Sequence, residues 1–131
     1  YSVSKKNVLR GMHFQKDKQQ EKLITVIKGS INDFCLDLRK NSKTYLKTFK
    51  IFLSEKNGKS IFIPKGFAHG FHALSNENIV LYKNSEYRFQ NKEIGINILD
   101  VKIFSKIKNK KYIISKRDNL NISLKKFIEN K

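Results

Sequence analysis

The residues best suited to chemistry in this chain of 131 residues are histidines, and two of them lie in short segments rich in glycine and aromatic residues. The first segment, VLRGMHFQ (residues 8–15), contains Arg10 and His13, and the second, GFAHGF (residues 66–71), contains His69. Imidazole titrates near neutral pH, so such a histidine can take up or release a proton under cellular conditions. Both segments are therefore candidates for a site that transfers protons.

Both histidine segments have the composition of strands rather than helices. Side chains alternate between the faces of a strand, so Arg10 and His13 would not share a face of a regular one. A bulge or bend near Gly11 would bring them to one site, and glycine adopts such a bend at little cost. The same alternation places His69 and His72 on opposite faces, which makes them poor partners for one metal ion.

Most of the chain consists of short apolar runs separated by turn residues. Lys28-Gly29 and Asn57-Gly58 are turn signals, and Ser123 is a candidate cap for a short terminal helix. Short, closely spaced strands are typical of a sandwich or barrel, so we expect a single all-β domain. The predicted strands span 21–28, 30–38, 45–53, 60–63, 68–74 and 79–84, with a weaker one at 95–99 and a helix at 123–129.

The run at 30–38 carries apolar residues on both faces. Ile31, Asp33, Cys35 and Asp37 fall on one face, and the residues between them fall on the other. Cys35 is the one cysteine of the chain, which excludes an intrachain disulfide and suits a reducing compartment such as the cytoplasm. Its apolar surroundings predict a buried, unreactive thiol.

The chain is strongly basic, with 28 Lys and Arg against 11 Asp and Glu and a formal net charge of +17. Nucleic-acid binding is one reading of that charge, but the lysines are scattered, and only residues 105–116 form a local cluster. No nucleic-acid-binding motif is present, so we expect no such partner, while a basic surface favours an anionic ligand such as a sugar diphosphate. No apolar run is long enough to cross a bilayer, so no membrane partner is expected.

Five blocks of the chain, in order, carry a resemblance to a known family. They are VLRGMHFQ (8–15), the run from 21 to 45, IPKGFAHGF (63–71), LYKNSEY (81–87) and SKRD (115–118). In these blocks the chain resembles the dTDP-4-dehydrorhamnose 3,5-epimerase family of nucleotide-sugar epimerases. The resemblance implies a cupin-type jelly-roll barrel with a short C-terminal helix. It also implies an isomerase that works as a homodimer on a nucleotide-diphosphate sugar, without cofactor or metal.

The resemblance further implies roles for four catalytic residues. The family inverts C3 and C5 of a dTDP-4-keto-6-deoxyhexose, and the carbanion next to the ketone is delocalised as an enolate. His13 matches the base, Asp118 its carboxylate partner, Lys22 the group near the ketone oxygen, and Tyr82 the acid on the opposite face. From pattern alone, Lys22 would be a surface lysine and Tyr82 a core aromatic residue.

Five further residues match substrate contacts. Arg10, His69 and Arg117 match positions that contact the diphosphate or sugar, Tyr87 matches the aromatic ring that stacks on the base, and Glu93 matches an acidic ligand-binding position. The chain departs from the family at Ile98-Leu99-Asp100, where Trp-x-Asp is usual, and at Phe104-Ser105, where Trp-Pro is usual. These departures bear on the identity of the substrate more than on the type of reaction.

The sequence leaves three alternatives open. The chain could epimerise only C3 or only C5, or use a different nucleotide sugar. It could be a non-catalytic cupin module, or a basic nucleic-acid binder. Family members also begin with a segment that precedes the position of Tyr1, so we expect the N-terminal strands of the family domain to be missing here.

Overall fold

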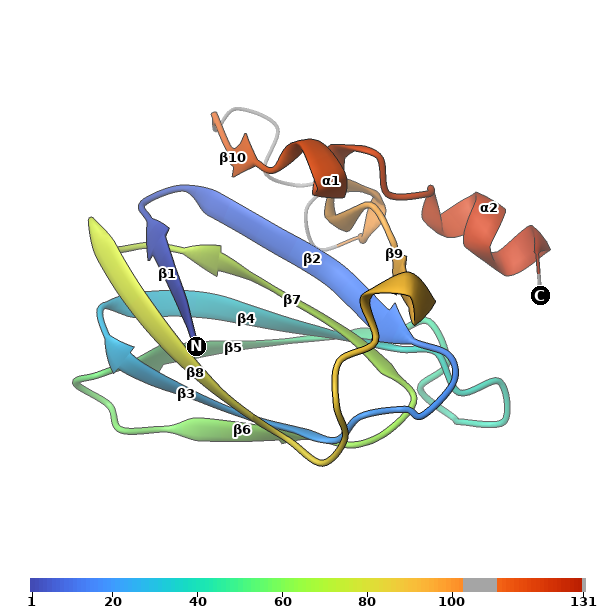
Figure 1. The fold of residues 1–131 in the computed structure, drawn as a ribbon, viewed down its shortest axis with the longest axis horizontal. Coiled ribbons are helices and arrows are strands. Elements are labelled where there is room, and N and C mark those ends of the chain that lie inside the picture. Colours follow the sequence, from blue (N-terminus) through green and yellow to red (C-terminus); the bar gives the residue numbers. More distant parts are fainter. Residues whose placement is uncertain (103–110, 131) are drawn as a thin grey trace.

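Alternation of apolar and polar side chains divides the chain into short strands, which the structure, a computed structural model, arranges as two packed sheets (Figure 1). It describes residues 1–102 and 111–130. The strands are β1 (Ser2–Lys5), β2 (Val8–Gln15), β3 (Lys22–Lys28), β4 (Ser30–Asp37), β5 (Thr48–Ser54), β6 (Ser60–Ile63), β7 (Phe67–Ala73), β8 (Glu77–Asn84), β9 (Glu93–Gly95) and β10 (Ile113–Ile114). The helices are the 3₁₀ turns η1 (Gln90–Lys92) and η2 (Ile98–Asp100), and α1 (Lys116–Asn119) and α2 (Leu124–Glu129).

Within the described ranges, one sheet has four strands in the order β1-β8-β3-β6, and the other has six. The larger sheet runs β10-β2-β7-β4-β5, with β9 also paired to β2. The pairing is antiparallel except between β10 and β2. The predicted all-β fold with a short C-terminal helix is confirmed, and the expected Ser123 cap accepts a hydrogen bond from the amide of Lys126.

The core has two parts because β4 is buried on both faces. Ile31 and Cys35 pack between the two sheets, whereas Phe34 and Leu36 pack on the outer face of the larger sheet. The C-terminal segment covers that outer face, where Phe127 of α2 joins the second part of the core (Figure 1). The alternation predicted for residues 30–38 is confirmed, and so is the burial of Cys35.

Two element predictions differ from the structure. The strand expected at 45–53 begins only at Thr48, because the preceding residues form a loop tied to Asp37. The strand expected at 95–99 is wrong: β9 ends at Gly95, and the Asn97 side chain caps the turn η2 instead. The short elements β10 and α1 were not predicted from the sequence. Half of the lysine cluster, and all of Phe104-Ser105, lie outside the described residues.

The loop between β4 and β5 is organised by the buried carboxylate of Asp37. Its Oδ1 accepts hydrogen bonds from the backbone and the Nε of Arg39, at 3.0 and 2.9 Å. Its Oδ2 accepts from Arg39 Nη2 at 2.8 Å and from the hydroxyls of Ser42 and Thr44, both at 2.6 Å. The Arg39 hydrogen bonds, helped by the two hydroxyls, outweigh burial and hold the pKa of Asp37 far below its usual range.

Replacing Asp37 with asparagine should therefore destabilise the fold in a pH-dependent way. Because the folded pKa is depressed, the carboxylate contributes stability above its unfolded pKa of about 4 and loses it as pH falls toward the folded value. We expect Asp37→Asn to cost about 2 kcal/mol at neutral pH, and the gap to shrink below about pH 4. Thermal unfolding of both proteins across pH measures this, and a gap that stays constant down to about pH 2.5 contradicts it.

Candidate functional site

Eight of the nine predicted site residues line one cavity of about 580 Å³, polar in character. They are Arg10, His13, Lys22, His69, Tyr82, Glu93, Arg117 and Asp118. Strands β2 and β7 of the larger sheet contribute to one side, β3 and β8 of the smaller sheet contribute to another, and the C-terminal segment completes the lining. The fold thus brings together residues that are far apart in the sequence.

Tyr87 is the one predicted site residue that does not line the cavity. Its side chain is 85% exposed, and it is not among the residues that line the cavity. Its carbonyl oxygen accepts a hydrogen bond from Gln15 Nε2 at 3.4 Å, which holds the backbone near β2. Its stacking role stays a prediction.

A bulge in β2 sets the direction of the histidine in the first segment. The pairing of β2 with β7 joins Arg10 to Phe71 and His13 to His69, and its register shifts between these two pairs. Gly11 lies within the shift with a φ of 95°, a left-handed conformation that glycine adopts without strain. The predicted bend near Gly11 is confirmed, and both Arg10 and His13 line the cavity.

His13 and Asp118 form a hydrogen-bonded pair, as predicted, with His13 Nε2 at 2.7 Å from Asp118 Oδ1. The second carboxylate oxygen accepts from the Gly11 amide at 3.1 Å. Burial acts to raise the pKa of Asp118, but the hydrogen bonds from His13 and Gly11 outweigh it and the pKa is lowered. An ionised carboxylate only accepts, so the proton of a neutral imidazole sits on Nε2 and Nδ1 keeps a lone pair.

Glu93 occupies the other side of His13, with Oε1 at 3.9 Å from Nδ1. Its Oε2 accepts hydrogen bonds from Arg88, at 2.6 Å, and from Arg117. Burial would raise the pKa of Glu93, yet the two guanidinium groups more than compensate and lower it. Arg117, predicted to contact the substrate, is therefore held by Glu93 in the described structure.

Arg10 is oriented by the first strand. Its Nε donates to Ser4 Oγ at 3.0 Å, and its Nη2 donates to the carbonyl of Val3 at 3.1 Å. These two bonds fix the guanidinium at the cavity wall, where it adds positive charge to the lining.

Lys22 and Tyr82 reach the cavity from the smaller sheet. They are diagonal neighbours, because Ile24 pairs with Tyr82 and Lys22 pairs with Asn84 across β3 and β8. Burial raises the pKa of Tyr82 to about 12 and lowers that of Lys22. The Tyr82 hydroxyl lies 3.2 Å from Ser2 Oγ. The phenol therefore stays protonated at neutral pH, and a partly desolvated ammonium group faces the same space.

Sequence reasoning gave no role to three residues that the structure connects to the site. Asp33 hydrogen-bonds to His69, Ser2 lies beside Tyr82, and Arg88 binds Glu93. A carboxylate on the interior face of an otherwise apolar run was the available signal for Asp33. Nothing in the pattern singled out Ser2 or Arg88.

Within residues 1–102 and 111–130, no cluster of three or more His, Cys, Asp and Glu side chains is placed to hold a metal ion. His72 points away from His69, as expected, and packs edge-on against the ring of Tyr112, at 5.2 Å between centroids. The histidines are thus divided between the two faces of the larger sheet.

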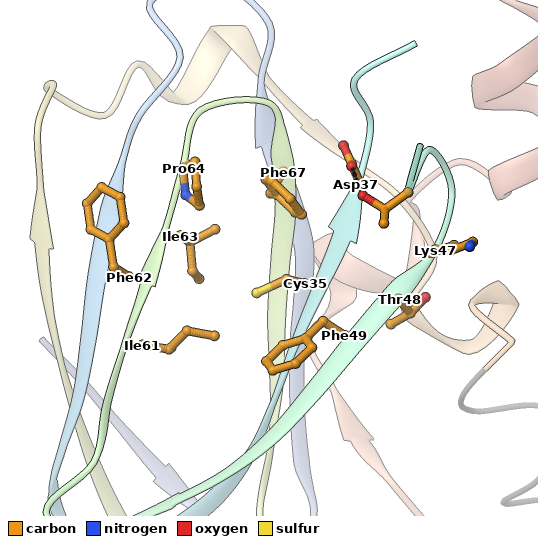
Figure 2. A pocket seen from close by; sticks show the side chains of 11 residues that line it. Cys35, Asp37, Lys47, Thr48, Phe49, Ile61, Phe62, Ile63, Pro64 and Phe67 are labelled. Atoms are coloured by element: carbon orange, nitrogen blue, oxygen red, sulfur yellow. Dashed lines mark hydrogen bonds between the residues drawn. The ribbon is translucent and has the colours of Figure 1, made fainter. Parts of the chain in front are cut away.

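A second cavity, also of about 580 Å³, is an apolar groove between β5 and β6 (Figure 2). Phe49, Ile61, Ile63 and Phe67 gather around it, and the Cys35 sulfur points toward its centre (Figure 2). Burial, first of all, raises the pKa of the Cys35 thiol far above its ordinary value, so the thiolate is suppressed. None of the predicted site residues lines this groove, which leaves the polar cavity as the candidate site.

Gly11→Ala should disrupt the site and the fold together. A Cβ on Gly11 would lie 2.5 Å from the carbonyl oxygen of His69, and alanine would be strained at this φ. We expect a loss of at least about 2 kcal/mol in unfolding free energy. Gly58→Ala is the matched control, since Gly58 also has a positive φ but its Cβ would meet nothing within 4 Å. Equal losses for the two variants in denaturant unfolding would refute the close packing at Gly11.

Comparison with solved structures identifies the class of protein. The chain superposes on a dTDP-6-deoxy-D-glucose-3,5-epimerase from Legionella pneumophila, in complex with dTDP-4-keto-L-rhamnose, with a TM-score of 0.87 and 35% identity. That match covers 95% of this chain and 66% of the other. A dTDP-4-dehydrorhamnose 3,5-epimerase from Bacillus anthracis, with TDP and PPi bound, gives a TM-score of 0.85 and 37% identity. This match covers 94% of this chain and 73% of the other. The fold is thus the cupin-type jelly roll of these epimerases.

Sequence comparison gives the family. The profile described as dTDP-4-dehydrorhamnose 3,5-epimerase matches residues 1–126, so the chain belongs to that family. The enzyme of that name from Methanothermobacter thermautotrophicus is 52% identical over 95 residues, which is 72% of this chain and 51% of that protein. The Escherichia coli enzyme is 41% identical over 97 residues, 73% of this chain and 52% of that protein. The chain spans about half the length of these curated relatives.

Proposed function

We propose that this chain inverts C3 and C5 of a dTDP-4-keto-6-deoxyhexose by removing and returning a proton at each carbon beside the ketone. One observation carries the proposal: His13 of the larger sheet, paired with Asp118 of α1, and a lysine–tyrosine pair from the smaller sheet line a single cavity. The ligands named for the related Legionella and Bacillus structures support the class of substrate.

The first step is removal of a carbon-bound proton by His13. Asp118 holds Nε2 of the ring as a donor, which leaves the lone pair of Nδ1 to accept the proton. The carboxylate then stabilises the imidazolium that forms. The electron pair of the broken C–H bond forms a C=C bond to C4, and the π pair of the C4=O4 bond moves onto O4, which gives the enolate.

Lys22 supplies the stabilisation of the enolate. An ammonium group preorganised in a site shielded from water can donate a strong hydrogen bond to the developing oxyanion. Burial lowers the pKa of Lys22, with Glu93 and other charges opposing the effect. A lowered pKa makes the ammonium a better hydrogen-bond donor to the enolate oxygen. This favours formation of the enolate.

Tyr82 completes the inversion by donating its phenolic proton to the carbanion from the side opposite His13. The product carries the inverted C–H bond, His13 is left protonated and Tyr82 is left as a phenolate. Because the pKa of Tyr82 is raised to about 12, the phenolate recovers a proton readily. Exchange with water resets both groups, and the same sequence repeats at the second carbon.

The proposal extends to the setting of the enzyme. No described helix is long and apolar enough to cross a membrane. We propose a homodimer, supported by the exposed aromatic side chains of Phe49, Phe52 and Phe62 on the edge strands β5 and β6. We also propose a cytoplasmic location, because the free thiol of Cys35 suits a reducing compartment.

Tyr82→Phe tests the acid. Removing the hydroxyl should leave the fold intact and lower kcat for epimerisation by about a hundredfold or more, because the proton donor is lost. NMR of a dTDP-4-keto-6-deoxyhexose incubated with the enzyme measures the rate of inversion. Tyr45→Phe is the control, since Tyr45 lies in the β4–β5 loop. A variant that inverts both carbons at the parent rate would reduce Tyr82 to a packing residue.

Lys22 should set the alkaline limit of activity. If the protonated ammonium is needed, activity falls as pH rises through the pKa of Lys22. Because that pKa is lowered, the fall comes at a pH below the ordinary lysine value of 10.5. Tyr82, at about 12, titrates too high to cause that limit. Lys22→Arg keeps its charge at higher pH, so we expect a lower kcat but an alkaline limb displaced upward. Identical alkaline limbs in the two pH–rate profiles would rule out this role.

A further inference from the structure

A second histidine–carboxylate pair lies beside the first and has no part in the reaction described above. His69 Nε2 is 2.8 Å from Asp33 Oδ2. His69 is directly opposite His13 across the β2–β7 pairing, and both line the same cavity. Two neighbouring imidazoles thus each have a carboxylate of their own, Asp118 from the C-terminal segment and Asp33 from β4.

Asp33 stands where an apolar residue would be expected. It lies in the middle of β4, is 0% exposed, and shares its face with the core residues Ile31 and Cys35. Its Oδ1 faces the Cys35 sulfur at 3.9 Å, a weak contact, so the His69 bond is its one strong side-chain hydrogen bond to a described residue. Burying a carboxylate in such a place costs several kcal/mol unless it is well paired.

The register of the sheet makes the pairing with His69 specific. Asp33 pairs with Phe71 and Cys35 pairs with His69, so Asp33 and His69 are diagonal neighbours on the interior face. The ring of His69 also meets the ring of Tyr82 edge-on, at 6.3 Å between centroids. Any rotation of the His69 ring would therefore disturb the tyrosine proposed as the acid.

We propose that Asp33 is a positioning residue whose carboxylate holds His69 in the Nε2–H form, with Nδ1 directed to the substrate; this rests on the proposed epimerase function. A carboxylate only accepts, so it selects the tautomer that carries its proton on Nε2. His69 Nδ1 hydrogen-bonds to none of the described residues and is left for the ligand. Lys22, Cys35 and Tyr82 are other titratable groups that interact electrostatically with Asp33.

The tautomer can be read directly by NMR of protein labelled with ¹⁵N in its histidines. Protonated and bare ring nitrogens resonate in well-separated ranges, and the His69 signals are those lost in His69→Gln. At alkaline pH, where the ring is neutral, the parent should show a protonated Nε2 and a bare Nδ1. The opposite tautomer in the unaltered protein would overturn the proposal without any variant of Asp33.

Asp33→Asn removes the preference for one His69 tautomer while keeping the shape of the side chain at position 33. An amide can accept from Nε2–H or donate to a bare Nε2, so both tautomers become possible and the His69 signals should shift toward a mixture. Asp37→Asn is the matched control, because Asp37 is buried on the same face of β4 but bonds to Arg39 rather than to a histidine. It should leave the His69 signals unchanged. A folded Asp33→Asn protein with the parent tautomer contradicts the proposal.

Kinetics separate this proposal from the proposed function. We expect Asp33→Asn to lower kcat about tenfold to a hundredfold, with little change in KM, and Asp37→Asn to leave both nearly unchanged. If Asp118→Asn slows epimerisation strongly while Asp33→Asn does not slow it, the positioning role is wrong and the epimerase function stands. If the parent has no epimerase activity, the proposed function fails, and the tautomer of His69 alone decides the role of Asp33.

Discussion

The site depends on one buried carboxylate that joins two ends of the described chain. Asp118 accepts from the His13 ring with one oxygen and from the Gly11 amide with the other, so α1 is fastened to the bulge of β2. The Ser115 hydroxyl accepts from the Asp118 amide at 3.0 Å and so fixes the first turn of α1. Without these bonds the carboxylate would be buried at high cost, and Nδ1 of His13 would have no defined direction.

Pairing of charges organises the rest of the cavity. Glu93 binds Arg88 and Arg117, and Asp118 binds His13, so each acidic lining residue has a partner. Behind the lining, Asp33 binds His69. The described structure pairs Lys22 with no carboxylate in this way, and burial lowers its pKa. In a chain with a formal net charge of +17, this leaves cationic groups facing a space that suits an anionic sugar nucleotide.

Local pattern predicted the features that depend on neighbouring residues. The spacing of Arg10 and His13 predicted a bulge at Gly11, and alternation predicted both faces of β4. Pattern alone could not place Asp118 beside His13, because 105 positions separate them; the resemblance to the family supplied that pair. The Asp33–His69 pair was missed because it depends on the register between β4 and β7, which is a property of the assembled sheet. The wrong start of β5 has a similar cause, since the bonds that Asp37 makes replace strand pairing in the preceding loop.

Deuterium exchange reports whether proton transfer takes place in this cavity at both carbons beside the ketone. The 131-residue chain would be incubated with a dTDP-4-keto-6-deoxyhexose in D₂O, and the recovered sugar examined by NMR. We expect solvent deuterium at C3 and at C5, with inverted configuration, and no incorporation when His13 is replaced by glutamine. Binding of the nucleotide sugar without deuterium at either carbon would contradict it.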